Sequence, residues 1–532
     1  MNIEITLKNY RCFPDSSPAR ITLRDGFTSF VGVNNAGKST LLKFFYEFRQ
    51  LFLMWSPAHP NLTPVIQGRV QPYSPAPTVL DQAELFSNSN NRDMQIGITL
   101  PDVTGSSKRA ICPIVNRVVI TVIRSTNTWK VDAFAGPTEV SAPNTSIGGD
   151  GIVLYAASGA PVGDFSEIFD AFKAISNTLY IGPFRNAVNV GSNDAYFDIQ
   201  VGTGFITSWK FYKSGNSKAQ NEACHKLTED IRRIFGYTDL DISSSADDRS
   251  LQVLIDGKSF KLPEVGSGLT QFILVLATAA IKTPSYVLID EPELNLHPSL
   301  QLDFLTTLAS YAGNGIVFAT HSMGLARAAA DRIYSVRSLA RGVSEVRDLE
   351  GTPRLAEFLG ELSFSSYKEL GFESVLLVEG RTEVKAIQQF LRLLKKDHQV
   401  VMIPLGGDTL INASSDAELV ELARISSRVY AVIDSERANA GQALSANRQG
   451  FVEACKKANI TCKVLDWRAL ENYLSDAAVK KAKGPIYQAL GPYQERGAVS
   501  PIWSKTDNWR IAREMSLAEL QVADLGQFLQ SL

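Results

Sequence analysis

The sequence has few cysteines, no apolar run of membrane-spanning length and almost no net charge. Its five cysteines are scattered over 532 residues, and no two have the Cys-x-x-Cys spacing of a zinc or redox site. The longest largely apolar run, residues 272–281, is about half of the ~20 residues that a membrane-spanning helix needs. Lysine and arginine number 53 against 55 acidic residues, so the whole molecule does not attract polyanions. These absences predict a cytoplasmic protein with reduced thiols and no membrane segment.

The length and composition indicate several folded units with ordinary apolar cores. At roughly 150 residues per domain, the chain should form about three units. Hydrophobic residues make up 45% of the chain and charged residues 20%, so each unit can bury a core without disulfides or structural metals. A single small binding module, a disordered chain and a fibrous protein are therefore excluded.

A glycine-rich loop stands between an expected strand at residues 27–31 and an expected helix from residue 40. It reads Gly32-Val-Asn-Asn-Ala-Gly37-Lys38-Ser39. In this context the loop amides and the helix N-terminus can surround phosphate oxygens, while Lys38 reaches the β- and γ-phosphates and Ser39 binds Mg²⁺. The residues expected to bind ATP here are Gly32, Asn34, Asn35, Ala36, Gly37, Lys38, Ser39 and Thr40.

Three later segments fit a nucleotide-hydrolysing site. An apolar strand at residues 286–290 ends in Asp290 and Glu291, which suit a magnesium ligand and a residue that polarises the attacking water. A second strand ends at His321, and Ser267-Gly268 opens an apolar helix whose amides could hold another phosphate face. Each segment alone is also typical of ordinary buried structure, so only their combination and order favour a function.

In that order these residues resemble the ATP-binding heads of the ABC superfamily, over about residues 1–340. The resemblance implies that two heads enclose ATP, with Ser267 of one chain reaching the γ-phosphate held by Lys38 of the other, and hence a homodimer or higher oligomer. It makes Ser267-Gly268 the signature, Asn295 part of the D-loop and His321 the switch histidine. Three candidates remain for the glutamine loop: Gln67, Gln71 and Gln95.

The opening residues 7–13 also resemble the start of chromosome-maintenance and repair ATPases. However, the chain between Ser39 and Ser267 has no sustained heptad pattern, which excludes long coiled-coil arms. Residues 57–150 predict loops and short strands such as 117–124. Residues from about 165 to 260 are expected to form a helical insertion that dimerises or binds a partner.

A second group of acids follows the strands expected near the C-terminus. The strand at residues 374–378 precedes Glu379 and a helix with Glu383 in its first turn, and the strand at 429–433 precedes Asp434 and Glu436. Parallel strands bring such residues to one sheet edge, and positions two apart in an extended strand face the same way. This oxygen-rich cluster suits Mg²⁺ or Mn²⁺ and phosphodiester cleavage. Each acid could alternatively be a solvated loop residue.

Glu379-Gly380, Glu383, Gly406-Gly407 and Asp434-x-Glu436 together resemble a topoisomerase-primase (Toprim) domain. Behind an ABC-like head, this domain resembles the overcoming-lysogenisation-defect (OLD) family of ATP-powered nucleases over nearly the whole chain. The resemblance implies a catalytic or metal-binding role for Glu379. It further implies metal ligands and a late catalytic lysine at the following positions: Glu383, Asp434, Glu436, Glu471 and Lys505. The usual Asp-x-Asp is Asp434-Ser435-Glu436 here, and the alternatives to the lysine are Lys480, Lys481 and Lys483.

We therefore predict an α/β chain with an ABC-type P-loop ATPase head at residues 1–365, carrying inserted β-rich and helical segments, and a Rossmann-like Toprim nuclease domain at residues 366–532. The predicted function is ATP-controlled, metal-dependent cleavage of nucleic acid, DNA rather than RNA, in bacterial anti-phage defence, alone or with a defence partner. Two alternatives are a repair or chromosome-maintenance ATPase with a structural C-terminal domain, and an ATP-gated ribonuclease that cuts host RNA.

Overall fold

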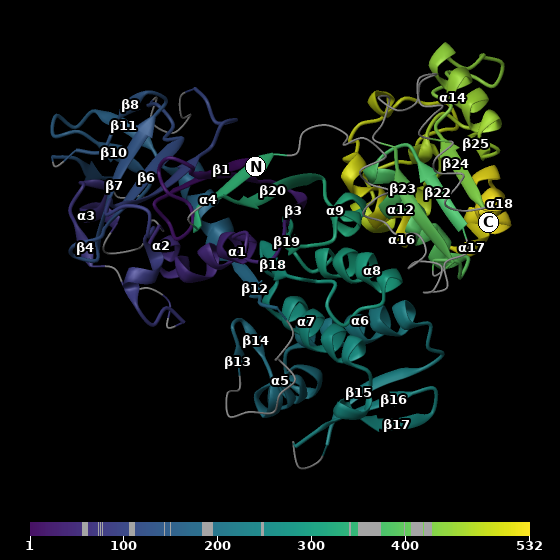
Figure 1. Cartoon of the computed structure of the whole chain (residues 1–532), viewed down its shortest axis with the longest axis horizontal. Coiled ribbons are helices and arrows are strands. Elements are labelled where there is room, and N and C mark those ends of the chain that lie inside the picture. The colour runs from purple at the N-terminus through teal and green to yellow at the C-terminus, as the bar shows by residue number, and fades with distance from the viewer. Residues whose placement is uncertain are drawn as a thin grey trace. The chain divides into compact units, whose positions relative to one another are not determined.

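Parallel strands with buried faces organise both halves of the chain in this computed structural model (Figure 1). The structure describes residues 1–55, 62–72, 74, 76, 78–105, 112–142, 144–148, 151–183, 195–245, 249–339, 342–348, 374–397, 399–405, 419 and 428–532. The chain divides into two compact units. The first comprises Met1–His321 and Arg332–Leu349, and the second comprises Ser322–Asp331 and Glu350–Leu532. The expected domain boundary at residue 365 lies outside the described residues.

A six-stranded sheet forms the centre of the first unit. Its strand order is β12 (Thr178–Ile181), β18 (Tyr286–Asp290), β19 (Gly315–Thr320), β3 (Gly26–Val31), β20 (Arg332–Ser338) and β21 (Ser344–Asp348). All neighbours pair in parallel except β20 and β21. β12, β18, β19 and β3 are mostly apolar and buried because both faces of the sheet are covered there, whereas β21 and the end of β20 are partly exposed. The three strands predicted around the nucleotide motifs are confirmed, and β3 lies between β19 and β20.

Helices follow the strands of this sheet and complete the first unit. α1 (Lys38–Glu47) begins directly after the glycine loop, and α7 (Ser267–Lys282) is almost wholly apolar and buried. Further helices of this unit are α2 (Arg49–Leu53), α3 (Leu62–Ile66) and α8 (Pro298–Ala309), with short 3₁₀ turns η1 (Gln82–Leu85) and η2 (Leu262–Glu264).

The predicted β-rich segment contributes most strands of a seven-stranded antiparallel sheet, drawn in purple and blue in Figure 1. It contains β1 (Ile3–Lys8), β2 (Ala19–Leu23), β4 (Gln71–Pro72), β5 (Met94–Thr99), β6 (Arg117–Ile123), β7 (Thr128–Ala135) and β8 (Thr138–Glu139). A smaller sheet joins β9 (Ser146–Ile147), β10 (Val153–Tyr155) and β11 (Pro161–Asp164). The strand predicted at residues 117–124 is confirmed as β6.

The expected helical insertion at residues 165–260 is only partly helical. It contains α4 (Ser166–Ser176), α5 (Gly202–Ser214) and α6 (Lys218–Phe235), together with the hairpin of β13 (Ala195–Tyr196) and β14 (Ile199–Gln200). Its last part is an antiparallel sheet of β15 (Leu240–Ser244), β16 (Leu251–Ile255) and β17 (Lys258–Lys261). These residues form strands because buried apolar side chains alternate along β15 and β16.

The second unit has a four-stranded parallel sheet of β23 (Val400–Pro404), β22 (Ser374–Val378), β24 (Val429–Ile433) and β25 (Thr461–Val464). Its helices are α9 (Met323–Ala329), α12 (Arg381–Leu393), α14 (Ala446–Lys457), α15 (Asp476–Lys483), α16 (Asn508–Arg513), α17 (Leu517–Gln521) and α18 (Asp524–Ser531). The 3₁₀ turns are η5 (Leu470–Tyr473), η6 (Arg496–Ala498) and η7 (Lys505–Asp507). The strands predicted at residues 374–378 and 429–433 are confirmed as β22 and β24, while Gly406 and Gly407 lie outside the described residues.

All five cysteines are free thiols. Among the helices that the structure describes, none combines the length and hydrophobicity of a membrane span.

Candidate nucleotide site and acidic cluster

The phosphate loop connects β3 to α1, and its lysine side chain donates hydrogen bonds to carbonyl oxygens of the same loop. Lys38 is 5% exposed, and its Nζ donates to the carbonyl oxygens of Gly32 at 2.7 Å and Val33 at 3.0 Å. Burial lowers the pKa of Lys38, although nearby acids oppose the shift. Two positions require glycine: a Cβ on Gly32 would lie 2.1 Å from the carbonyl oxygen of Val336, and Gly37 has a φ of 104°.

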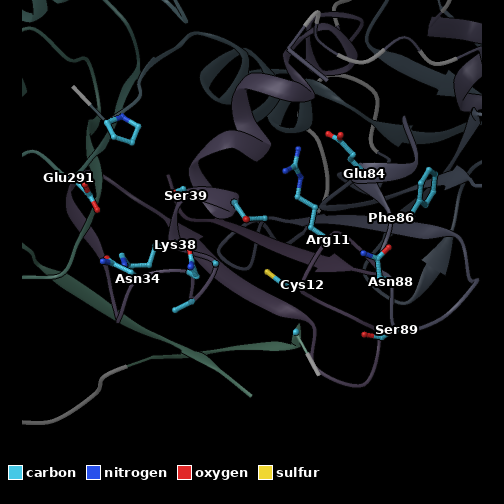
Figure 2. Close-up of a pocket in the computed structure, with 16 residues that line it drawn as sticks. Arg11, Cys12, Asn34, Lys38, Ser39, Glu84, Phe86, Asn88, Ser89 and Glu291 are labelled. Atoms are coloured by element: carbon cyan, nitrogen blue, oxygen red, sulfur yellow. The ribbon is translucent and has the colours of Figure 1, made fainter. Parts of the chain in front are cut away.

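A cavity of about 820 Å³ opens over this loop and contains much of the predicted ATP site (Figure 2). From the loop and α1 it is lined by Asn34, Asn35, Ala36, Gly37, Lys38, Ser39 and Thr40. Gly32 does not line it. The remaining lining residues are Arg11, Cys12, Glu84, Phe86, Asn88, Ser89, Pro183, Glu291 and Gly342. The stretch from Glu84 to Ser89 was missed from the sequence, because it carries no motif.

Asp290 is the buried acid at the end of β18. It is 2% exposed, and neither carboxylate oxygen accepts a hydrogen bond of normal geometry. Burial raises the pKa of Asp290 to about 6, and the nearby Ser39 hydroxyl opposes the shift. The Asp290 carboxylate and the neighbouring Ser39 hydroxyl are hard oxygen ligands, which Mg²⁺ prefers. These two residues therefore fit the implied ion.

Glu291 and His321 lie at the ends of neighbouring strands. Glu291 lines the cavity, has a φ of 52°, and donates its backbone N–H to the carbonyl oxygen of Ala319 at 2.8 Å. His321 Nδ1 lies 3.1 Å from Oε1 of Glu293, which also accepts from Thr320 Oγ1 at 2.6 Å. Glu293 was not predicted from the sequence, since an acid two residues after Glu291 matches no motif. It holds the end of β19 that carries His321.

The signature residues lie away from the phosphate loop of their own chain. Ser267 is exposed at the N-terminus of α7 and does not line the cavity. A Cβ on Gly268 would lie 3.1 Å from the carbonyl oxygen of Asn295, so the expected D-loop packs on the signature. None of the three glutamine-loop candidates (Gln67, Gln71 and Gln95) lines the cavity.

In the second unit, one arginine joins two of the predicted acids. Arg448 of α14 donates from Nη2 to Glu379 Oε1 and from Nε to the carbonyl oxygen of Asp434, both at 2.8 Å. Glu379 Oε2 accepts from the backbone N–H of Asp434 at 3.0 Å. Burial raises the pKa of Glu379, and Arg448 opposes that shift. The sequence gave no sign of Arg448, because it lies on a later helix outside any motif.

Three further candidates lie within electrostatic range of Asp434. Lys505 Nζ lies 3.1 Å from Oε1 of Glu471, a side chain that is 1% exposed. Burial alone would lower the pKa of Lys505, but Glu471 and then Glu383 raise it. Burial raises the pKa of Glu383. The pKa of Asp434 is raised well above its usual value, first by burial and then by the negative charges of Glu379, Glu383 and Glu471. The structure thus gathers three buried acids, the partly buried Glu379 and one lysine.

Glu436 and the competing lysines lie differently. β24 ends at Ile433 and Glu436 has a φ of 55°, so the alternation expected to turn Asp434 and Glu436 the same way does not continue. Asp434 is 4% exposed, whereas the Glu436 side chain is 42% exposed and lies 3.2 Å from Arg468. The competing lysines pair with other acids: Lys480 with Asp476, Lys481 with Glu514 and Lys483 with Asp507.

The fit of a metal ion to these acids is a matter of donor chemistry and not of an assembled ligand set. Within the described part of the chain, no group of three or more His, Cys, Asp or Glu side chains is arranged to hold a metal ion. The donor chemistry nevertheless fits Mg²⁺, which commonly takes one or two carboxylates and keeps several waters. Neither carboxylate oxygen of the buried Glu471 accepts a hydrogen bond of normal geometry.

Comparison with known proteins assigns ATPase domains to parts of the chain. A family model described as "AAA ATPase domain" matches residues 1–142, and one described as "AAA domain, putative AbiEii toxin, Type IV TA system" matches residues 210–327. The glutamate transport ATP-binding protein GluA of Corynebacterium efficiens is 34% identical over 119 residues, which are 21% of this chain and 48% of that protein. GluA of Corynebacterium glutamicum is 38% identical over 84 residues, which are 15% of this chain and 35% of that protein. The chain therefore spans less than half the length of these curated relatives.

Two solved structures of similar chains are SMC heads. The SMC head domain from Thermotoga maritima has a TM-score of 0.35 at 15% identity, with 66% of this chain and 100% of that chain covered. An SmcHead bound to the C-winged helix domain of ScpA has a TM-score of 0.37 at 13% identity, with 65% and 96% covered. At these TM-scores the superpositions add nothing to the sequence matches.

The family matches and the phosphate-loop geometry identify the first unit as an α/β P-loop ATPase head. Neither family model extends beyond residue 327. The resemblance of the second unit to a Toprim domain, and of nearly the whole chain to the OLD family, therefore rests on the sequence motifs alone.

Proposed function

We propose that the protein is a dimeric ATPase whose nucleotide state controls a metal-dependent endonuclease site in its second unit. The observation that carries the nuclease part is the grouping of Glu379, Glu383, Asp434, Glu471 and Lys505 at the carboxyl edge of a parallel sheet. Ligands bind at this edge in parallel α/β sheets. Glu383 and Asp434 are buried beside further carboxylates that raise their pKa values, which favours a bound cation because a cation relieves this repulsion.

In the ATPase half, each residue beside the cavity has a separate role. The backbone amides of the loop and Lys38 hold the β- and γ-phosphates, and Ser39 with Asp290 would hold Mg²⁺, which neutralises developing charge on the phosphates when bound. Glu291 orients and polarises the attacking water. Glu293 fixes His321 beside the γ-phosphate through its contacts with the end of β19.

The dimer completes this site by supplying the signature. Ser267 is exposed, and it begins a helix whose first N–H groups point outward with partial positive charge. Because Ser267 does not line the cavity of its own chain, a second copy can supply these donors to the γ-phosphate. ATP then acts as the bridge between two heads.

In the nuclease half, Mg²⁺ or Mn²⁺ would be held by one or two of the buried carboxylates, with water completing its shell. Arg448 orients Glu379 and the backbone at Asp434, and Lys505 stabilises negative charge on the scissile phosphate. We propose nucleic acid as the substrate, DNA before RNA. The proposed role in anti-phage defence, alone or with a partner, comes from the resemblance to the OLD family, and the proposed cytoplasmic location comes from the sequence composition.

The test is cleavage of supercoiled plasmid, single-stranded DNA and RNA by purified protein with Mg²⁺ or Mn²⁺, with and without ATP. Glu379→Gln and Lys505→Met should abolish cleavage and leave ATP hydrolysis intact, whereas Lys38→Ala should change only the response to ATP. Lys480→Met is the matched control, because Lys480 pairs with Asp476 away from the acids. Cleavage that survives both Glu379→Gln and Lys505→Met would refute this assignment of the site.

A second candidate is a repair or chromosome-maintenance ATPase whose second unit is a structural platform. The observation that favours it is the internal neutralisation of the cluster, in which Arg448 pairs with Glu379 and Lys505 with Glu471. This candidate predicts that Glu379→Gln folds normally and retains biological activity. Loss of activity in a normally folded variant would exclude it.

A further inference from the structure

The segment Ser322–Asp331 links the ATPase sheet covalently to the second unit. It follows His321 at the end of β19 and precedes β20, and both strands pair with β3, the strand that leads into the phosphate loop. The segment nevertheless belongs to the second compact unit. Ser322 caps α9 by accepting from the backbone N–H of Leu325 at 3.2 Å, so the helix starts immediately after His321.

Within the second unit, an ion pair and two hydrogen bonds join the end of this segment to α12. Lys385 Nζ lies 3.0 Å from Asp331 Oδ1, and the side chains of the two residues are 1% and 12% exposed. Arg381 Nη1 also donates to the carbonyl oxygens of Ala330 at 3.4 Å and Asp331 at 3.5 Å. Separating a buried pair leaves an uncompensated charge, so Asp331 and α12 should move together.

The same helix carries a residue of the acidic cluster on another side. Glu383 precedes Lys385 by two positions, which places the two side chains on nearly opposite faces of α12. Glu383 lies within electrostatic range of Lys505 and Glu471, whereas Lys385 faces Asp331. α16, which follows Lys505 in the chain, packs against α12. A displacement of α12 would therefore change the position of Glu383 relative to its neighbours.

We propose that Asp331 and Lys385 are positioning residues that make the placement of Glu383 depend on the nucleotide state at His321. This inference rests on the proposed function and adds its route of regulation. When His321 engages the γ-phosphate, the start of α9 shifts with it, and the Asp331–Lys385 pair transfers that shift to α12. Neither residue touches ATP or the scissile phosphate.

The test compares amide hydrogen exchange in α12, with and without ATP and Mg²⁺, in a hydrolysis-slowed Glu291→Gln parent and in the same protein carrying Asp331→Asn with Lys385→Met. Removing both charges avoids leaving either member of the pair as an uncompensated charge. ATP should slow exchange in α12 of the parent, and this response should be lost in the double variant while ATP affinity is kept. The control is Arg347→Met with Glu345→Gln, an ion pair on β21 at 2.8 Å.

A second readout is the cleavage rate with ATP divided by the rate without it. This ratio should become equal to one in the double variant, and Asp331→Glu, which keeps the charge, should restore the parent ratio. If the double variant does not fold, Asp331→Asn alone against Asp331→Glu provides the same comparison. An unchanged exchange response in the double variant, or none in the parent, overturns the proposal. Absence of cleavage with the exchange response intact overturns only the nuclease function.

Discussion

Arg448 Nη2 donates a hydrogen bond to Glu379 Oε1 at 2.8 Å, from a helix that lies 69 positions further along the chain. The same guanidinium holds the carbonyl oxygen of Asp434 through Nε. One side chain on α14 thereby ties the residue after β22 to the residue after β24. A planar guanidinium suits this double contact, which a lysine could not reproduce.

Arg448→Met should destabilise the second unit by about 3–5 kcal/mol, because it leaves the carboxylate of Glu379, whose side chain is only 15% exposed, without its cation. The pKa of Glu379 should rise further, so the loss should be larger at neutral than at acidic pH, where the carboxyl is protonated. Thermal unfolding at the two pH values measures both effects. Lys456→Met, an exposed position on the same helix, should have little effect, and an equal loss in the two variants would contradict the prediction.

Asp290 should make the nucleotide-free head less stable as pH rises. Its pKa is raised from 3.8 to about 6, so the folded state binds the proton more tightly than the unfolded state does. The stability from this proton is fully present below 3.8 and is lost as pH rises through about 6, which amounts to about 3 kcal/mol.

Asp290→Asn should therefore stabilise the head at neutral pH in magnesium-free buffer and lose this advantage in acid. Thermal melts with a chelator check this, with Asp170→Asn on the surface of α4 as the control. A constant difference between wild type and Asp290→Asn across the range would show that burial does not govern this carboxyl.

Glu293→Gln should reduce ATP turnover about 10- to 100-fold, the effect of losing a hydrogen bond to a charged group. The reason is that Glu293 Oε1 accepts from Thr320 and contacts His321. The reduction should not add to that of His321→Ala, since both changes disturb one contact. Steady-state hydrolysis of the two single variants and the double variant measures this. Full additivity, or an equal loss in the exposed control Glu264→Gln, would disprove the coupling.

Lys38→Ala and Ser267→Arg should complement each other when mixed. Each protein alone should fail to hydrolyse ATP, because every site lacks either its lysine or its signature. A mixed dimer contains one site in which both are intact, so the mixture should regain hydrolysis. A mixture that stays inactive while size measurements show mixed dimers would mean that the site is not shared.

The local motifs predicted the elements that carry the chemistry. Continuous apolar runs and the residues that follow them defined β3, β18, β22 and β24, because a buried parallel strand needs such a run whatever surrounds it. The strands β15–β17 were not predicted. The preceding residues have a helical composition, and the alternation of apolar and polar residues along β15 and β16 is short. The position of Glu436 was mispredicted because the alternation of an extended strand ends with β24.

The sequence by itself determined the phosphate loop, the acids at the strand ends and the two α/β units, because these depend on residues adjacent in the chain. Only the tertiary structure decided which distant side chains join them. Glu84 and Asn88 reach the nucleotide cavity, Arg448 holds Glu379, and Asp331 pairs with Lys385 in the second unit. Such contacts depend on how elements pack, and packing leaves no periodic or motif signal in the sequence.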